Sequence, residues 1–263
     1  MKDLSNKVAI ITGSSSGVGA ATSRLFASLG CHVVINYNAN SAGAEQVAKE
    51  CEELGVETVC FGGSVANDTD CVAMVKAAID KWGRVDILVN NAGTTKFVDH
   101  NNLDGLDAED FQRIYGVNVI GCYQMTRAAR VAMEANDEGG AVVNIASTAA
   151  VTGIGSSIAY AASKGAMVTM TMSLARVLGP KIRMNAVCPG FIEGDWLREG
   201  LGDTQYEAVR DANRRDAPLG VTACPDTVAE AILHFVMGPQ VVTGETLIVD
   251  GGRHLMSTPL GRR

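Results

Sequence analysis

The sequence predicts a single α/β domain with a doubly wound parallel sheet of about seven strands and helices on both faces. Short apolar runs alternate with helical patterns along the whole chain, which is typical of such a sheet. The 263 residues are 47% apolar and only 19% charged, and the 29 glycines suit a large core with many tight turns. No repeat, low-complexity tract or linker appears, so we expect one domain over residues 1–263.

Each expected element follows from its local pattern. The apolar runs predict strands at 8–12, 32–37, 58–62, 85–90, 141–146, 182–187 and 246–249. Helical spacing predicts helices at 20–29, 42–54, 69–82, 107–135, 160–178 and 226–237. Gly30 ends the first helix, and Gly179-Pro180 ends the fifth.

Two segments predict more than secondary structure. The helix at 160–178 is apolar nearly all round, which favours coverage on both sides and hence a homo-oligomer, with a tetramer expected. The C-terminal strand is the second expected interface. The composition turns polar from Glu193 to Asp216, with Gly200 and Gly202 as candidate hinges, and this favours a substrate lid around residues 190–216.

Charge and composition exclude several classes of protein. The net charge of −7 argues against nucleic acid and anionic membranes as partners. No stretch is long enough to span a bilayer, and the chain starts without a signal-peptide apolar region. Seven scattered cysteines indicate reduced thiols in a cytoplasmic protein, and four distant histidines predict no metal cluster.

A glycine-rich turn follows the first strand. The run Gly13-Ser14-Ser15-Ser16-Gly17-Val18-Gly19 lies between a strand and a helix, a layout that points backbone N–H groups at a pyrophosphate. Its spacing departs from the commoner Gly-x-Gly-x-x-Gly, so a merely flexible turn is the alternative. No carboxylate lies between Val33 and Ala44, where NAD binding favours one, while neutral donors such as Ser15, Ser16 and Asn38 are plentiful. This pattern favours NADP over NAD, although no Arg or Lys is present there.

Tyr160 and Lys164 are four residues apart and share one face of the expected helix. Lowering a tyrosine pKa from about 10 to neutrality needs roughly 4 kcal/mol. One ammonium about 4 Å away supplies around 4 kcal/mol at an effective dielectric near 20. The pair is therefore a candidate general acid/base, with an ordinary amphipathic turn as the alternative.

Three asparagines stand out in apolar surroundings. Asn90 and Asn91 end a buried strand, at the edge where open α/β sheets bind ligands, although turn chemistry also explains them. Asn118 interrupts an apolar helical stretch, and its side chain needs a buried hydrogen-bond partner or a water. Its position alone therefore favours a structural role.

Taken together, these motifs closely resemble the short-chain dehydrogenase/reductases over nearly the whole chain. The matching residues are Thr12 to Gly19, Asn90-Asn-Ala-Gly93, Asn118, Ser147, Tyr160-Ala-Ala-Ser-Lys164 and Pro189-Gly190. The interval of thirteen residues from Ser147 to Tyr160 also fits the family. The pattern is nearest to 3-oxoacyl thioester reductases, and the fold implied is Rossmann-type.

The resemblance implies a role for each motif. Tyr160 would exchange a proton with the carbonyl oxygen, Ser147 would hold that oxygen, and Lys164 would bind the nicotinamide ribose. Asn118 would anchor a water in the proton relay. The implied cofactor-binding residues are Gly13, Ser15, Ser16, Gly17, Val18, Gly19, Asn38, Ser64, Val65, Asn90, Ala92, Gly93, Tyr160, Lys164, Pro189, Gly190 and Ile192. The expected substrate-lining residues include Thr95, Phe97, Ile154, Phe191 and Trp196, with Thr94, Val151 and Leu197 beside them.

The chain departs from the family pattern at two positions. Ser64 stands where family members often carry an Asp that touches adenine, and Ser16 stands where NADP-dependent members often carry a basic residue. The leading hypothesis is an NAD(P)(H)-dependent oxidoreductase that interconverts a secondary alcohol and a ketone. The alternatives are a catalytically silent dinucleotide-binding regulator and a sugar-nucleotide epimerase or dehydratase, for which the chain after Gly190 is short.

Overall fold

The computed structural model describes residues 3–256, which form a seven-stranded sheet in the order β3-β2-β1-β4-β5-β6-β7. Every neighbouring pair of strands is parallel, which confirms the predicted fold class. The strands are β1 (Val8–Ile11), β2 (His32–Tyr37), β3 (Thr58–Gly62), β4 (Ile87–Asn90), β5 (Gly140–Ile145), β6 (Ile182–Pro189) and β7 (Thr246–Val249). All seven coincide with predicted runs to within a few residues.

The central strands are apolar without alternation because both of their faces are covered. Every residue of β1, β4, β5 and β6 is buried, as expected for a parallel sheet between two helical layers. The edge strands differ, since β3 exposes Cys60 and β7 leaves Leu247 36% exposed.

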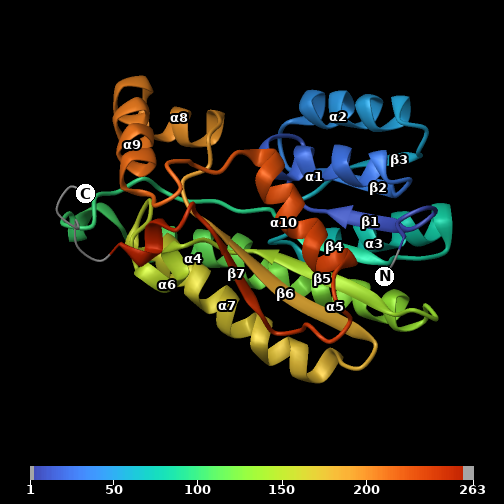
Figure 1. Cartoon of the computed structure of the whole chain (residues 1–263). Helices are drawn as coiled ribbons and strands as arrows, with labels where there is room; N and C mark the ends of the chain where they lie inside the picture. The colour runs from blue at the N-terminus through green and yellow to red at the C-terminus, as the bar shows by residue number, and fades with distance from the viewer. Residues whose placement is uncertain (1–2, 257–263) are drawn as a thin grey trace.

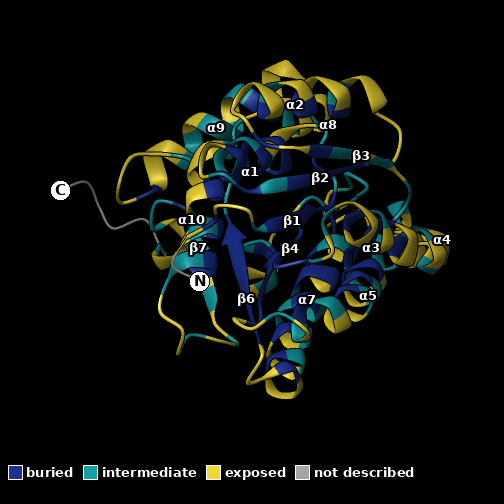
Figure 2. Cartoon of the chain, turned by 90° about the vertical axis from the view of Figure 1, so that its right-hand side faces the viewer, coloured by how far each residue is buried: buried dark blue, intermediate teal, exposed yellow. Residues whose placement is uncertain are grey.

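Helices cover the sheet in two layers (Figures 1 and 2). One layer holds α1, α2 and α10, and the other holds α3, α5 and α7. The helices are α1 (Gly17–Ser28), α2 (Ser41–Glu53), α3 (Asp68–Trp82), α4 (Ala108–Tyr115), α5 (Cys122–Glu134), α6 (Ala149–Thr152), α7 (Ile158–Leu178), α8 (Asp195–Leu201), α9 (Asp203–Asp216) and α10 (Pro225–Met237). Short 3₁₀ turns lie at Leu103–Gly105 and Arg253–Leu255.

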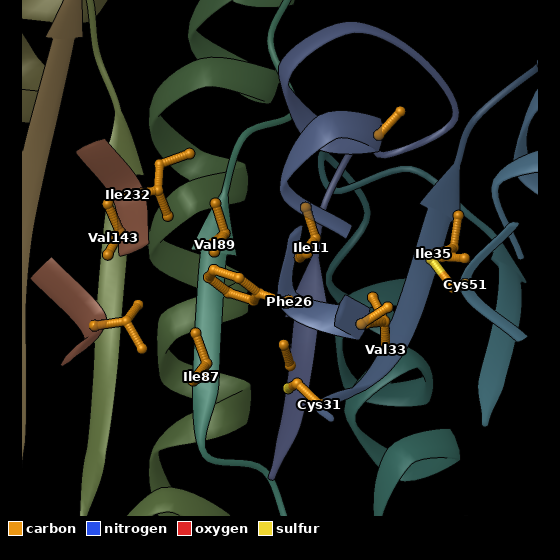
Figure 3. Packing of buried hydrophobic residues seen from close by; sticks show 14 of the residues in the cluster. Ile11, Phe26, Cys31, Val33, Ile35, Cys51, Ile87, Val89, Val143 and Ile232 are labelled. Atoms are coloured by element: carbon orange, nitrogen blue, oxygen red, sulfur yellow. The ribbon is translucent and has the colours of Figure 1, made fainter. Parts of the chain in front are cut away.

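Phe26 of α1 lies at the centre of the first layer's core (Figure 3). It is fully buried and belongs to one cluster with Ile11, Val89 and Val143 from three strands and with Ile232 of α10. Burying one such side chain stabilises the fold by about 2–3 kcal/mol. The cluster holds α1, and with it the glycine-rich turn, firmly on the sheet.

The single helix expected at 107–135 is continuous but contains a π-helical turn, Gly116–Gly121, between α4 and α5. Asn118 lies in this turn, so the predicted interruption of the helical ladder is confirmed. The helix expected to start at Tyr160 begins two residues earlier, because the Ser157 side chain caps it by accepting from the Tyr160 N–H (3.3 Å).

Residues 190–216 fold as α8 and α9, which stand beyond the carboxyl ends of the strands (Figure 1). Gly202 joins the two helices at a φ of +76°, a conformation that favours glycine. Gly200 lies inside α8, one residue before the end of that helix.

Candidate active site

The glycine-rich turn packs directly on the loop that follows β4. Gly13 has a φ of +61°, and a Cβ there would lie 2.9 Å from the Cα of Ala92. A Cβ on Gly19 would lie 2.6 Å from the Asn91 side-chain nitrogen. Only glycine allows these approaches, so the two predicted motifs form one continuous surface.

The polar side chains of Asn36, which the sequence reasoning did not select, and of Thr12 hold this surface in place. Asn36, at the end of β2, accepts from the Gly13 N–H (3.0 Å) and donates to the carbonyls of Phe61 and Gly63. Thr12 Oγ1 accepts from the N–H groups of Asn91 and Ala92, both at 3.0 Å. Asn36 could have been found from the sequence, because it is a polar residue within an apolar run that ends at the ligand-binding edge of the sheet.

This surface fits a dinucleotide. No side chain caps the N-terminus of α1 and no acid lies in its first turn, which leaves its N–H groups for a phosphate. Among residues 3–256, the buried Asn90 Oδ1 has no hydrogen-bond partner, and the narrow cavity that Asn90 lines with Val65 and Ala92 has no room for a water. A buried polar atom of this kind is normally satisfied, so Asn90 is unusual in this part of the site.

The predicted adenosine side is more open. Asn38 is exposed after β2, and Asn40 caps α2 by accepting from the Gly43 N–H (3.0 Å). The Ser64 N–H donates to Asp70 (2.9 Å), so a carboxylate that sequence reasoning missed lies next to Ser64.

Tyr160 and Lys164 lie one turn apart on α7, as predicted. The Lys164 Nζ lies 5.5 Å from the centre of the Tyr160 ring and donates to the carbonyl of Ile145 at the end of β5 (2.7 Å). A Cβ on Gly93 would lie 3.6 Å from the same Nζ. The structure therefore brings the Tyr-Lys pair to the loop that supports the glycine turn.

The pKa values of this pair depart from the sequence expectation. Burial raises the pKa of Tyr160 to about 12, and a hydrogen bond with Ser147 offsets only part of this effect. Burial also lowers the pKa of Lys164 to about 8. A net shift of the tyrosine pKa toward neutrality, which the sequence led us to expect, is therefore not found in this structure, in which desolvation is the largest effect on both groups.

Asn118 finds the buried partners that its position demands. Its Oδ1 accepts from the Thr94 N–H (2.8 Å), and its Nδ2 donates to the Thr94 carbonyl (3.0 Å) and to Ser163 Oγ (2.9 Å). Ser163 Oγ in turn donates to the Tyr160 carbonyl (2.7 Å). The π-helical turn is thus tied to α7 at the Tyr-Lys pair, through a serine that sequence reasoning did not select.

A second buried polar network lies beneath the site. Asn90 Nδ2 donates to Asn144 Oδ1 (2.9 Å) and to Thr126 Oγ1 (3.2 Å), and Asn144 Nδ2 donates to Thr171 Oγ1 (2.8 Å). The network joins β4, β5, α5 and α7. Asn144 was missed because it lies within an apolar run and no motif marks it.

Aromatic side chains surround Tyr160 on the expected substrate side. The Trp196 ring centre lies 6.3 Å from that of Tyr160 and 5.8 Å from that of Phe97. Phe191 contacts Tyr206 of α9 (5.3 Å between ring centres), and Thr95 Oγ1 lies 2.6 Å from Ser156 Oγ. Ile154, by contrast, is 71% exposed on a turn.

Several comparisons agree with this geometry. A family model described as enoyl-(acyl carrier protein) reductase matches residues 13–254. A protein assigned as ketoacyl reductase 2 of the granaticin polyketide synthase of Streptomyces violaceoruber is 37% identical over 249 residues (95% of this chain, 96% of the relative). L-rhamnose 1-dehydrogenase (NAD(P)(+)) of Azotobacter vinelandii is 35% identical over 254 residues (95% of this chain, 97% of the relative).

A solved structure assigned to the short-chain dehydrogenase/reductases, from Burkholderia xenovorans, superposes with a TM-score of 0.87 and 38% identity. It covers 95% of this chain and 98% of its own. The chain belongs to the short-chain dehydrogenase/reductases. This confirms the family resemblance that the sequence motifs indicated.

As a short-chain dehydrogenase/reductase, the protein is an NAD(P)-dependent oxidoreductase of alcohols and ketones. All seven cysteines are free thiols. Within residues 3–256, no helix is long and apolar enough to cross a membrane, and no cluster of metal-ligating side chains appears.

Proposed function

We propose that this protein reduces a ketone to a secondary alcohol with Tyr160 as the proton donor, and runs the reverse reaction with Tyr160 as the acceptor. The observation that carries the proposal is the meeting of Ser147, Tyr160 and Lys164 beside the glycine-turn surface. A bound nicotinamide dinucleotide supplies or accepts the hydride. Burial keeps Tyr160 protonated at neutral pH, so the phenol carries the proton that the carbonyl oxygen receives.

The other site residues position the reacting groups. Ser147, whose hydroxyl lies next to the Tyr160 phenol, holds the carbonyl oxygen beside that phenol. Lys164 binds the nicotinamide ribose, and its positive charge favours the phenolate that forms when Tyr160 gives up its proton. The Asn118 side chain is committed to Thr94 and Ser163, so Asn118 serves the proton relay through its backbone and a bound water.

The remaining predicted residues hold the cofactor and the substrate. Gly13, Gly17 and Gly19, with Ser15, Ser16 and Val18, cradle the pyrophosphate. Val65, Ala92 and Gly93 contact the adenosine, and Pro189, Gly190 and Ile192 contact the nicotinamide. Phe97, Phe191 and Trp196, together with Thr95, line the substrate pocket, with α8 and α9 as its lid.

We propose NADP as the preferred cofactor. The segment after β2 carries no carboxylate that would repel a 2′-phosphate, and Asn38 and Ser41 are exposed beside the N-terminus of α2. Rates of NADPH and NADH oxidation, measured separately with the same ketone, test this preference. Faster oxidation of NADH would contradict it.

The Tyr160→Phe variant tests the mechanism. We expect turnover of a short 3-oxoacyl thioester to fall at least about 1,000-fold, while cofactor affinity, measured by fluorescence titration, changes by less than about threefold. Thr169→Ala, on the exposed side of the same helix, is the matched control and should retain full activity. Turnover retained in Tyr160→Phe would refute the assignment.

We also propose a homotetramer of a cytoplasmic protein. Met172 and Val177 expose apolar surface on α7, and β7 is an open edge of the sheet. Light scattering coupled to size-exclusion chromatography tests the assembly, and a monomeric mass would contradict it.

A further inference from the structure

The aromatic side chains at Tyr160 form one continuous wall from three separate parts of the chain. Phe97 comes from the loop after β4, Tyr160 from α7 and Trp196 from α8. The planes of Phe97 and Trp196 meet at 55°, and those of Tyr160 and Trp196 at 45°, so the rings are tilted against one another. Their separations lie in the range of favourable aromatic pairs.

The position of Trp196 depends on a close approach between α8 and Phe97. A Cβ on Gly200 would lie only 2.1 Å from the Phe97 ring, so the edge of that ring packs on the bare backbone of α8. Any side chain at position 200 would displace α8 or the ring. The Phe97–Gly200 contact thus sets how Trp196 faces Tyr160.

The two lid helices are braced as one unit. Arg198 of α8 pairs with Asp203 and Glu207, both at 2.8 Å, and its guanidinium lies 4.1 Å from the centre of the Tyr206 ring. The Tyr206 hydroxyl accepts from the Gly194 N–H (3.1 Å). Charged and polar contacts therefore hold α8 and α9 together, and the three side chains of the wall beside Tyr160 are uncharged.

A rigid aromatic wall favours flat ligands over flexible ones. An acyl chain must fix several torsions to lie along such a surface, and each fixed rotor reduces its affinity. A fused ring system covers the same surface with no rotors to fix. The hydroxyl pair of Thr95 and Ser156 supplies a polar contact for a ring substituent.

Building on the proposed function, we infer that Phe97 and Trp196 form a clamp that selects a planar, uncharged ring ketone over a linear acyl ketone. The ring lies against Trp196 while its carbonyl reaches Ser147 and Tyr160. Trp196 is half exposed, which leaves part of its side chain accessible to a ligand.

The test compares 2-tetralone, a cyclic ketone fused to a flat benzene ring, with the N-acetylcysteamine thioester of 3-oxobutanoate. We expect a higher kcat/KM for 2-tetralone in the unmodified protein. Trp196→Ala should lower kcat/KM for 2-tetralone by about tenfold, mainly through KM, and lower that for the thioester by a clearly smaller factor. Trp196→Phe should restore most of the loss, and the exposed Leu103→Ala serves as the control. Equal losses on both ketones, or a preference for the thioester, would overturn the clamp.

Fluorescence separates failure of the clamp from failure of the reductase. The chain has two tryptophans, and Trp82 stacks on His32 outside the aromatic wall. The Trp82→Phe variant therefore leaves Trp196 as the single fluorescent reporter. We expect 2-tetralone to quench Trp196 saturably, and Phe97→Ala to weaken this binding. Thioester turnover without quenching would overturn the clamp and leave the reductase standing. Quenching without reduction of either ketone by NADPH or NADH would support the ring site and overturn the proposed reductase.

Discussion

The buried ammonium of Lys164 should make the protein less stable at neutral pH than it would be without that charge. Lys164 is 3% exposed, and burial lowers its pKa from 10.5 to about 8. Since each pKa unit corresponds to about 1.4 kcal/mol, the charged form costs the folded state about 3 kcal/mol at pH 7.

The sign of the pH dependence follows from proton binding. Between the folded pKa near 8 and the unfolded value of 10.5, the unfolded chain holds a proton on Lys164 that the folded chain has released. Stability from this group therefore rises with pH through that window. Lys164→Met removes the group and should lose turnover, while its hydrogen bond to Ile145 is lost at every pH alike.

Urea unfolding of the two proteins at several pH values measures the effect. The free energy of unfolding of the original protein, minus that of Lys164→Met, should increase by about 2 kcal/mol between pH 7 and pH 10. Burial raises the pKa of Cys51, Cys71 and Cys122 above this range, so these thiols titrate there mainly in the unfolded chain, which is alike in the two proteins. Lys49→Met removes an exposed lysine from α2 and should change by less than about 0.5 kcal/mol over the same range. A flat difference for Lys164→Met would refute the reasoning.

Three further substitutions probe the scaffold around the site. Gly13→Ala places a Cβ 2.9 Å from the Ala92 Cα at a φ of +61°, so cofactor affinity, measured by calorimetry, should fall at least about tenfold. Arg183→Met removes the buried donors to the last carbonyls of α10 and should lower the free energy of unfolding in urea by about 2 kcal/mol. Asn144→Leu leaves an Asn90 N–H without its acceptor, so we expect a loss of about 2–3 kcal/mol by the same measurement, and an unchanged midpoint would contradict it.

The sheet was predictable because its signal is local and repeated. Each strand is an apolar run bounded by glycine or polar residues, and burial on both faces removes any need for alternation. Element ends were less predictable, since they depend on single contacts such as the Ser157 cap of α7. Gly200 also depends on a single contact. Glycine in a polar segment indicates a hinge, but here the absence of a side chain makes room for the Phe97 ring.

The candidate site also has one part that the sequence predicts and one part that depends on the folded structure. Tyr160 and Lys164 are neighbours because helical spacing alone makes them so, and the sequence was enough to place them together. Their pKa values were not predictable, because desolvation depends on what the fold packs around them. Asn36 and Asn144 act across strands that are distant in the chain, and no spacing rule brings such pairs together.

The π-helical turn at Gly116–Gly121 sets the rotation of α4, which directly precedes it, about the helix axis. A π turn accommodates one extra residue, and each residue turns an α-helix by about 100°. Deleting one residue here would restore a regular ladder, but it would rotate α4 by that angle about its axis. Arg113 and Asp110 would then leave the loop that holds Thr94 and Lys96, which they contact at present. The length of this segment, as much as the identity of Asn118, therefore determines which face of α4 meets the active-site loop.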